Sequence, residues 1–256
     1  MGNMYACGLF SVRTELKKDM WGTLRKLKRM GFDAVEFFGG FTKTAQEVRA
    51  AIDEAGLFCC GWHTPWEYLK EDALIATVTY NKVLGNENLV VPGLPGEMTN
   101  SADAWRKTAK EFEELSGRLS YYGMRLGYHN HDSEFTETEG IIPFDHFFET
   151  APGADIQLDN GNALSSGTGY DIYAPLRRFP FRMKTTHLKP YSAKDGYATM
   201  IGQDDIDWAK YFSLCYEHQD IDWFIVEYEC EEKHGQLEGV EECLKALKKM
   251  ERGGMI

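Results

Sequence analysis

Histidines, carboxylates and a lysine stand two residues apart in three short segments of the 256-residue chain, each just after an apolar run. The segments HNH, HLK and EYE place together His129 and His131, His187 and Lys189, and Glu227 and Glu229. Residues two apart on a β-strand face the same side of the sheet. Because charged groups inside a fold are costly unless they are paired or bound to a metal, this repetition predicts a polar site.

Three further ionisable residues come near the ends of apolar runs: Glu36, His63 and Asp159. Taken singly, His63 is an ordinary interior histidine, and Asp159 before Asn160-Gly161 is an ordinary turn residue. Taken together, histidine and carboxylate ligands without a thiolate suit Mn²⁺, Zn²⁺, Co²⁺, Fe²⁺ or Mg²⁺.

The chemistry that such a site predicts is proton transfer next to a carbonyl. A divalent cation polarises a carbonyl or alkoxide oxygen and acidifies the adjacent C–H. A nearby carboxylate or histidine then carries the proton as general base and acid. Isomerisation, epimerisation and elimination all follow this course, and the ligands alone leave metal-assisted hydrolysis open.

The elements that would position these residues alternate between strand and helix along the whole chain. Strand-like apolar runs lie at 5–13, 32–40, 57–64, 88–93, 124–131, 154–162, 181–190 and 222–230. Helical patterns separate these runs, as in parallel β-α-β units. Eight units predict a single (β/α)8 TIM-barrel domain over residues 1–256, with its chemistry at the C-terminal ends of the strands. A doubly wound sheet is the alternative, but it calls for a glycine-rich turn after the first strand, where the chain reads FSVRTEL.

Composition and charge exclude several kinds of partner. A net charge of -12 repels nucleic-acid phosphates and anionic lipid, and the sequence has no apolar run long enough to span a bilayer. The first residues lack the pattern of a secretory signal, and the six cysteines form no C-x-x-C pair. We therefore expect a cytoplasmic protein with no nucleic-acid or membrane partner. The sequence leaves the oligomeric state open, a homo-oligomer included.

Six segments resemble, in order, the sugar phosphate isomerase/epimerase group of xylose isomerase-like TIM barrels, and the resemblance covers nearly the whole chain. They read LFSVRTELKKDMWGTLRKLKRMGFDAVEFFG, LGYHNHDSEF, IQLDNGNA, THLKP, IGQDDIDW and IVEYE. The resemblance implies a divalent metal at the ends of strands five to eight and a sugar or keto-sugar substrate. On this chain the implied ligands are His129, Asp159, His187 and Glu227, with His131 as the alternative to His129 at strand five.

The sequence departs from the group's pattern at several points. Many epimerases of the group have a glutamate where this chain has His129, a feature of the Y-H-N-H branch, so one of two carboxylate bases is missing. This leaves Glu227 or His131 to remove the proton and Lys189 to stabilise the resulting enediolate. The usual H-x-K-D, G-x-G-x-I-D and D-x-G-H read HLKP, GQDDID and DNGN here. For the substrate we expect contacts from Glu36, His63, Trp62, Trp66 and Arg13, the tryptophans forming an apolar wall.

Four functions are compatible with these residues. The first is a metal-dependent sugar isomerase or epimerase, and the second is a lyase that eliminates the aglycone of a 3-oxo-glycoside through the same enolate. The third is a non-catalytic sugar-binding or subunit-partner barrel, against which the complete set of Asp159, His187 and Glu227 speaks. An AP-endonuclease-like hydrolase is disfavoured because it needs three zinc ions and a basic DNA groove. The presence of a phosphate on the substrate stays open, with Arg13 as the candidate to bind it.

Overall fold

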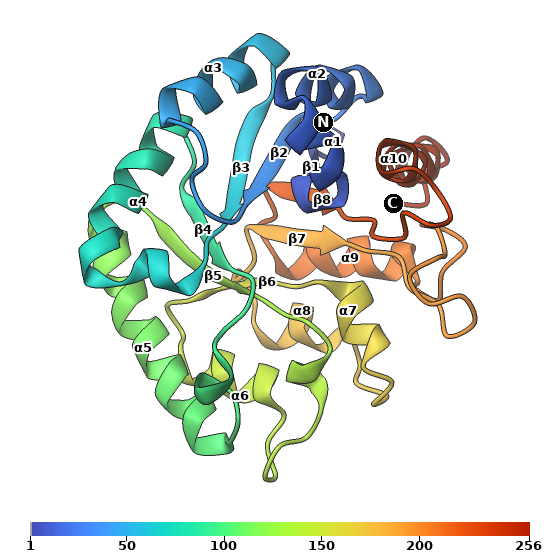
Figure 1. Cartoon of the computed structure of the whole chain (residues 1–256). Helices are drawn as coiled ribbons and strands as arrows, with labels where there is room; N and C mark the ends of the chain where they lie inside the picture. The colour runs from blue at the N-terminus through green and yellow to red at the C-terminus, as the bar shows by residue number, and fades with distance from the viewer. Residues whose placement is uncertain (1) are drawn as a thin grey trace.

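Eight short parallel strands stand at the centre of the molecule, and the helices form a ring around them (Figure 1). In the computed structural model, which describes residues 2–256, the strands are β1 (Tyr5–Gly8), β2 (Ala34–Phe38), β3 (Phe58–His63), β4 (Asn88–Val91), β5 (Arg125–His129), β6 (Asp155–Gln157), β7 (Thr185–Leu188) and β8 (Trp223–Val226). Their order is β6-β5-β4-β3-β2-β1-β8-β7. A parallel bridge between Asp159 and His187 joins β6 to β7 and closes the ring. The predicted (β/α)8 barrel is confirmed.

The helices of the outer ring follow the strands in turn. They are α1 (Arg13–Lys18), α2 (Met20–Met30), α3 (Ala45–Ala55), α4 (Glu71–Leu84), α5 (Ala102–Tyr121), α6 (Pro143–Thr150), α7 (Asn160–Ser165), α8 (Ala174–Arg178), α9 (Trp208–His218) and α10 (Gln236–Arg252), with 3-10 turns η1 (Leu9–Val12), η2 (Trp66–Leu69), η3 (Gly96–Met98) and η4 (Ser133–Phe135). The first predicted strand is too long, because the chain leaves β1 at Gly8 and turns into η1. The helix expected after it is broken at Asp19, whose side chain accepts from Gly22 N at 2.9 Å and caps α2.

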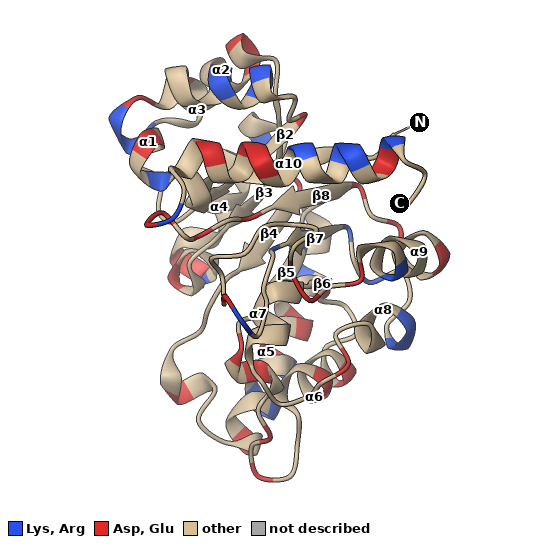
Figure 2. Ribbon diagram, turned by 90° about the vertical axis from the view of Figure 1, so that its right-hand side faces the viewer, with Lys and Arg blue, Asp and Glu red and all other residues tan. Residues whose placement is uncertain are grey.

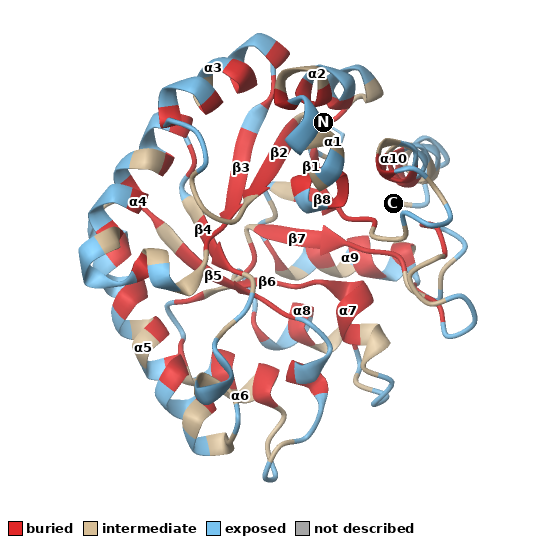
Figure 3. Ribbon diagram, viewed as in Figure 1, coloured by how far each residue is buried: buried red, intermediate tan, exposed pale blue. Residues whose placement is uncertain are grey.

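The barrel interior changes from apolar to polar along the strands. Ala6, Ala34, Cys60 and Ile225 form a small buried cluster inside it. Because strand residues two apart share a face, the position after Ala34 on the inner side is Glu36, and the one after Ile225 is Glu227. Buried residues also cover the inner faces of the surrounding helices (Figure 3). The apolar layer therefore supports a polar layer toward the C-terminal ends of the strands.

Charged residues lie mostly on the outer helices. In Figure 2 the first half of α10 is mostly acidic and its second half mostly basic. The sequence has Glu238, Glu241 and Glu242 in the first half, and Lys245, Lys248, Lys249 and Arg252 beside a single acid, Glu251, in the second. This order suits the helix dipole, which favours acids near the N-terminus and bases near the C-terminus. Within residues 2–256 we find no helix with the length and apolar character needed to cross a membrane.

Candidate metal centre and active-site cavity

Four buried side chains meet at the C-terminal ends of β5 to β8. They belong to His129, Asp159, His187 and Glu227, and each offers a ligand atom within 4.8 Å of the others. Asp159 Oδ2 lies 3.9 Å from both His129 Nε2 and His187 Nδ1. His187 Nδ1 also forms a hydrogen bond with Glu227 Oε2. This is the ligand set expected from the sequence, gathered in one place.

The two oxygens of Asp159 have different surroundings. Oδ1 caps α7 by accepting from Asn162 N at 2.7 Å, whereas Oδ2 is buried and has no hydrogen-bond partner within the described residues. Asn130 fixes the backbone here, because its side chain accepts from Asp159 N at 2.9 Å and donates to Asp159 O at 3.0 Å. A buried carboxylate oxygen without a partner is costly, and a bound cation would remove that cost.

Gln157, two residues before Asp159, sets the orientation of His129. Its amide nitrogen donates to Glu36 Oε1 at 2.7 Å and to Thr185 Oγ1 at 2.9 Å. Since an ionised carboxylate only accepts, this contact determines which way the amide faces. The amide oxygen then accepts from His129 Nδ1 at 3.0 Å and from His63 Nε2 at 2.7 Å. His129 therefore carries its proton on Nδ1 and turns an unprotonated Nε2 toward Asp159.

Glu36 orients the ring of His187, as Gln157 orients that of His129. Its Oε2 accepts from His187 Nε2 at 2.7 Å, which leaves Nδ1 on the side of Asp159 and Glu227. Gly61 makes this arrangement possible, because a Cβ at that position would lie 2.7 Å from Glu36 Oε1. Metal-bound histidines in proteins almost always donate their other N–H to such an acceptor. Both histidines of the group have this second contact.

The charges of the buried group also fit a divalent cation. Three buried carboxylates, Glu36, Asp159 and Glu227, stand against one buried ammonium, Lys189. With neutral imidazoles this leaves two uncompensated negative charges, which a divalent cation would neutralise. Lys189 Nζ donates to Glu227 Oε1 at 3.0 Å and to Glu229 Oε2 at 2.6 Å.

In the absence of a cation, bound protons neutralise part of the negative charge of this group. Burial lowers the pKa of His187, but the carboxylates of Glu36 and Glu227 outweigh it and raise the pKa to about 10. Burial raises the pKa of Asp159 to about 7, against the opposing charge of Lys189. Burial, with the charge of His187 adding to it, holds the pKa of His129 well below its usual value. His129 is thus neutral, as a metal ligand must be.

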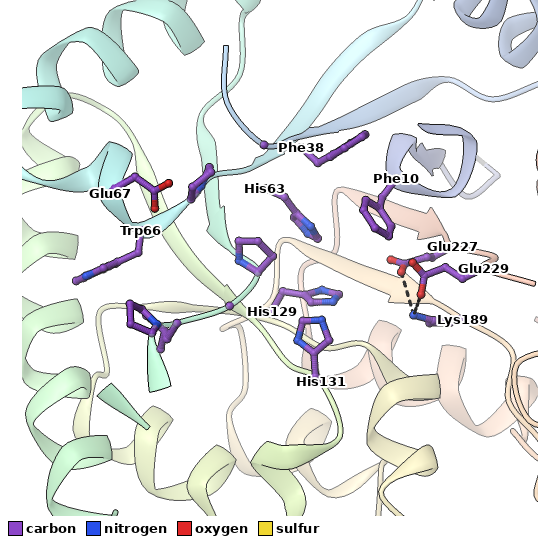
Figure 4. Close-up of a pocket in the computed structure, with 16 residues that line it drawn as sticks. Phe10, Phe38, His63, Trp66, Glu67, His129, His131, Lys189, Glu227 and Glu229 are labelled. Atoms are coloured by element: carbon purple, nitrogen blue, oxygen red, sulfur yellow. Dashed lines mark hydrogen bonds and ion pairs between the residues drawn. The ribbon is translucent and has the colours of Figure 1, made fainter. Parts of the chain in front are cut away.

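A cavity of about 540 Å³ opens directly above this group (Figure 4). His129, Lys189 and Glu227 line its inner end, and His63 and His131 lie along its wall. His131 is exposed to the cavity, and its backbone N–H donates to Glu134 Oε2 at 2.9 Å. Charged groups, the imidazole of His131 and two of the candidate metal ligands, His129 and Glu227, therefore face one cavity.

Comparison with known proteins establishes the family. The sequence of residues 24–250 matches the xylose isomerase-like TIM barrel family. The chain belongs to this family. A search of curated proteins finds no significant match to the chain.

Solved structures show the same barrel. Two are sugar phosphate isomerase/epimerases from Parabacteroides distasonis. One is 23% identical with a TM-score of 0.79 and covers 97% of this chain and 94% of its own, and the other is 21% identical with a TM-score of 0.82 and covers 97% and 98%. A D-allulose 3-epimerase from Methylomonas sp. is 12% identical, has a TM-score of 0.68 and covers 96% of this chain and 97% of its own. At these identities the likeness concerns the fold.

Not all residues expected to touch a substrate lie in the cavity of this xylose isomerase-like barrel. His63 and Trp66 line it. Trp62 does not, because it is buried in the core, stacks on Phe37 with ring centroids 5.0 Å apart and donates to Gly39 O at 2.7 Å.

Arg13 and Glu36 also lie outside the lining. Arg13 forms an ion pair with Glu231 and donates to Phe10 O at 3.0 Å, behind the phenylalanine that faces the cavity. Glu36 lies beneath the floor, bonded to His187 and Gln157. The structure thus places Trp62, Arg13 and Glu36 outside the lining of this cavity.

Two residues of the site were not among those assigned from the sequence. Gln157 is neutral and reads as an ordinary strand residue, although it stands two positions before Asp159 and so shares its face. Glu229 was visible in the EYE segment, and the structure adds that it holds Lys189 and lines the cavity. The spacing of two puts Glu229 on the face of Glu227 and Gln157 on the face of Asp159, but only Glu229 carries a charge that marks it in the sequence.

Proposed function

We propose that this chain is a divalent-metal-dependent sugar isomerase or epimerase that moves a proton next to a carbonyl. The observation that carries the proposal is the buried group of His129, Asp159, His187 and Glu227, with one carboxylate oxygen left without a partner. Two comparisons support it. The chain belongs to the xylose isomerase-like TIM barrel family, and its fold resembles that of a sugar phosphate isomerase/epimerase. A divalent cation held by these four residues would polarise the substrate carbonyl and acidify the neighbouring C–H.

His131 is the best-placed proton carrier. Its imidazole lines the cavity and makes no hydrogen bond to another described side chain, and Glu134 anchors its backbone. Both oxygens of Glu227 are engaged, one by His187 and one by Lys189. Of the two candidates for the general base, His131 is therefore the freer to take a proton from carbon and to return it.

Lys189 would stabilise the negative charge of the enediolate. Glu227 and Glu229 hold its ammonium at the inner end of the cavity, and the ring of Tyr197 lies 4.8 Å away. Burial tends to lower the pKa of Lys189, but the surrounding carboxylates outweigh it and keep the pKa above its usual value. A fixed positive charge that needs no rearrangement is the arrangement that stabilises a developing oxyanion.

Elimination from a 3-oxo-glycoside is the second candidate. The same base would take the proton from C2, the C1–C2 double bond would form, and the C1–O bond would break. The leaving oxygen would take up a proton, from the protonated base or from water, so that the aglycone is released as an alcohol. The extension of the cavity beyond the histidines, toward Trp66, favours this candidate because it leaves room for a leaving group. A non-catalytic sugar-binding barrel would bind the same ligands without exchange.

The test is solvent-deuterium exchange at carbon. The Mn²⁺-loaded protein would be incubated in D₂O with D-fructose and with methyl 3-oxo-β-D-glucopyranoside, and deuterium followed by NMR. We expect metal-dependent exchange on at least one of them, with an epimer or isomer as product, or methanol if elimination occurs. The absence of metal-dependent exchange on both would overturn the proposal.

A further inference from the structure

The cavity has two ends of different chemistry. Figure 4 shows Trp66 and Glu67 on the opposite side of the histidines from Lys189 and Glu227. Beyond the histidines most of the residues in the lining have apolar side chains, and we call this part the apolar end. It consists of Pro65, Trp66, Pro92, Leu94 and Pro95. Its only charged neighbour in the lining is the carboxylate of Glu67.

The apolar end is rigid. Trp66 stacks on Phe112 with ring centroids 5.1 Å apart and planes 5° from parallel, so the core holds its ring in place. Two prolines in the segment PGLP, directly after β4, restrict the backbone on both sides of Leu94. A surface that is already fixed loses little entropy when a ligand covers it. The apolar end is thus suited to bind a flat or ring-shaped apolar group.

The charges of the cavity disfavour a phosphate. Among the described residues that line it, Lys189 is the only lysine or arginine, and Glu227 and Glu229 already occupy its ammonium. With Glu67 at the far end, three carboxylates face the space. Arg13, the one candidate to bind a phosphate, is paired with Glu231 outside the cavity. A phosphate here would face these three carboxylates and would compete with two of them for a single ammonium.

The size of the cavity agrees with a ligand of two parts. Its volume of about 540 Å³ lies in the range of roughly 300–1,000 Å³ found for sites that hold drug-sized ligands. A sugar ring at the inner end, near Glu227, leaves the apolar end to be filled by something else. Covering that carbon surface removes it from water and contributes to affinity.

We propose that the substrate is an unphosphorylated sugar that carries an apolar, ring-sized substituent, and that this substituent lies against the apolar end. The proposal rests on the proposed function for the position of the sugar carbonyl. It goes beyond that function because it names a second binding region in the cavity and excludes sugar phosphates as substrates.

Calorimetric titration of the Mn²⁺-loaded protein with three matched ligands tests the proposal. They are methyl 3-oxo-β-D-glucopyranoside, its phenyl counterpart and the 6-phosphate of the methyl compound. We expect the phenyl compound to bind about tenfold more tightly than the methyl compound, and the phosphate to bind more weakly than both. In Leu94→Ser the ratio of the phenyl to the methyl affinity should fall to about one. Ile75→Ser, an exposed site on α4 outside the cavity, should keep the ratio.

Equal binding of the phenyl and methyl compounds would overturn the proposal, as would tighter binding of the phosphate or binding of D-fructose alone. Exchange assays on the same ligands separate this failure from that of the proposed function. Normal exchange without a phenyl preference would contradict only the apolar end. A phenyl preference without exchange would contradict only the proposed function, and the absence of all binding would overturn both.

Discussion

Gln157 Oε1 accepts a hydrogen bond from His129 Nδ1 at 3.0 Å, and this contact determines which ring nitrogen of His129 faces Asp159. The amide is itself oriented by Glu36, which accepts from its nitrogen at 2.7 Å. A neutral side chain outside the candidate ligand group thus orients one of its histidines. A histidine that binds a cation through Nε2 must carry its proton on Nδ1.

Gln157→Leu is expected to weaken Mn²⁺ binding by about 10–100-fold, the range for loss of such an outer contact. The variant removes the acceptor of His129 without changing any ligand. Binding would be measured by calorimetry, and the tautomer of His129 by long-range ¹H–¹⁵N NMR of the metal-free protein. Gln219→Leu is the matched control, since Gln219 is also buried and accepts from Met183 N at 3.2 Å in another part of the fold. Equal metal affinity in both variants would show that Gln157 is merely structural.

Asp159→Asn should reduce Mn²⁺ affinity by about 100-fold or more, because it removes a charged ligand. Asparagine is as good a helix cap as aspartate, so α7 should be retained and the thermal unfolding midpoint should change little. Asp207→Asn makes the same exchange at the cap of α9, where Asp207 accepts from Lys210 N at 3.0 Å, and should bind Mn²⁺ normally. An Asp159→Asn protein that binds as tightly as the native chain would remove Asp159 from the ligand set.

His131→Gln is expected to slow carbon–deuterium exchange by about 10²–10⁴-fold, the usual contribution of a general acid–base group. Mn²⁺ affinity should remain within about twofold, because the imidazole of His131 lies outside the buried ligand group. Exchange rates and binding constants would be compared with those of His218→Gln, a half-buried histidine at the end of α9. If exchange continued at the native rate, the proton carrier would have to be Glu227.

Metal affinity should rise with pH. The pKa of Asp159 is about 7 and that of His187 about 10 in the metal-free site, so both hold protons below pH 7 and His187 alone holds one between pH 7 and 10. A cation must displace these protons. For each proton that is displaced, the Mn²⁺ affinity is expected to fall about tenfold when the pH is lowered by one unit. Calorimetry from pH 6 to 8 in buffers of different ionisation enthalpy would count the protons. Binding that is independent of pH and releases none would contradict this.

Period-two spacing and strand–helix alternation predicted that polar residues gather at one end of the barrel. Once eight parallel strands were expected, the ends of β5 to β8 had to meet at one face, but it was the resemblance to the sugar phosphate isomerase/epimerase group that singled out His129, Asp159, His187 and Glu227 as ligands. The same alternation explains why Trp62 lies outside the cavity lining, because neighbours on a strand face opposite sides. With His63 turned inward on β3, Trp62 had to point into the core.

Other features of the site depended on where strands end, how helices are capped and which side chains form hydrogen bonds, none of which the pattern of strands shows. Arg13 was expected at the end of the first strand, but β1 ends at Gly8, and η1 brings Phe10 rather than Arg13 into the cavity lining. The DNG segment was weighed as a turn, whereas Asp159 caps α7 and thereby directs one carboxylate oxygen into the site. Gln157 drew no attention because an uncharged residue gives no sign of its four hydrogen bonds until its partners on other strands are known.

Anomalous diffraction from crystals soaked in Mn²⁺ tests the central claim most directly, because it locates the cation without reference to activity. We expect one strong manganese peak per chain, in contact with His129 Nε2, Asp159 Oδ2, His187 Nδ1 and Glu227. A folded protein at saturating Mn²⁺ with no peak among these four residues, or with its strongest peak elsewhere, would contradict the assignment of the metal centre and the chemistry derived from it.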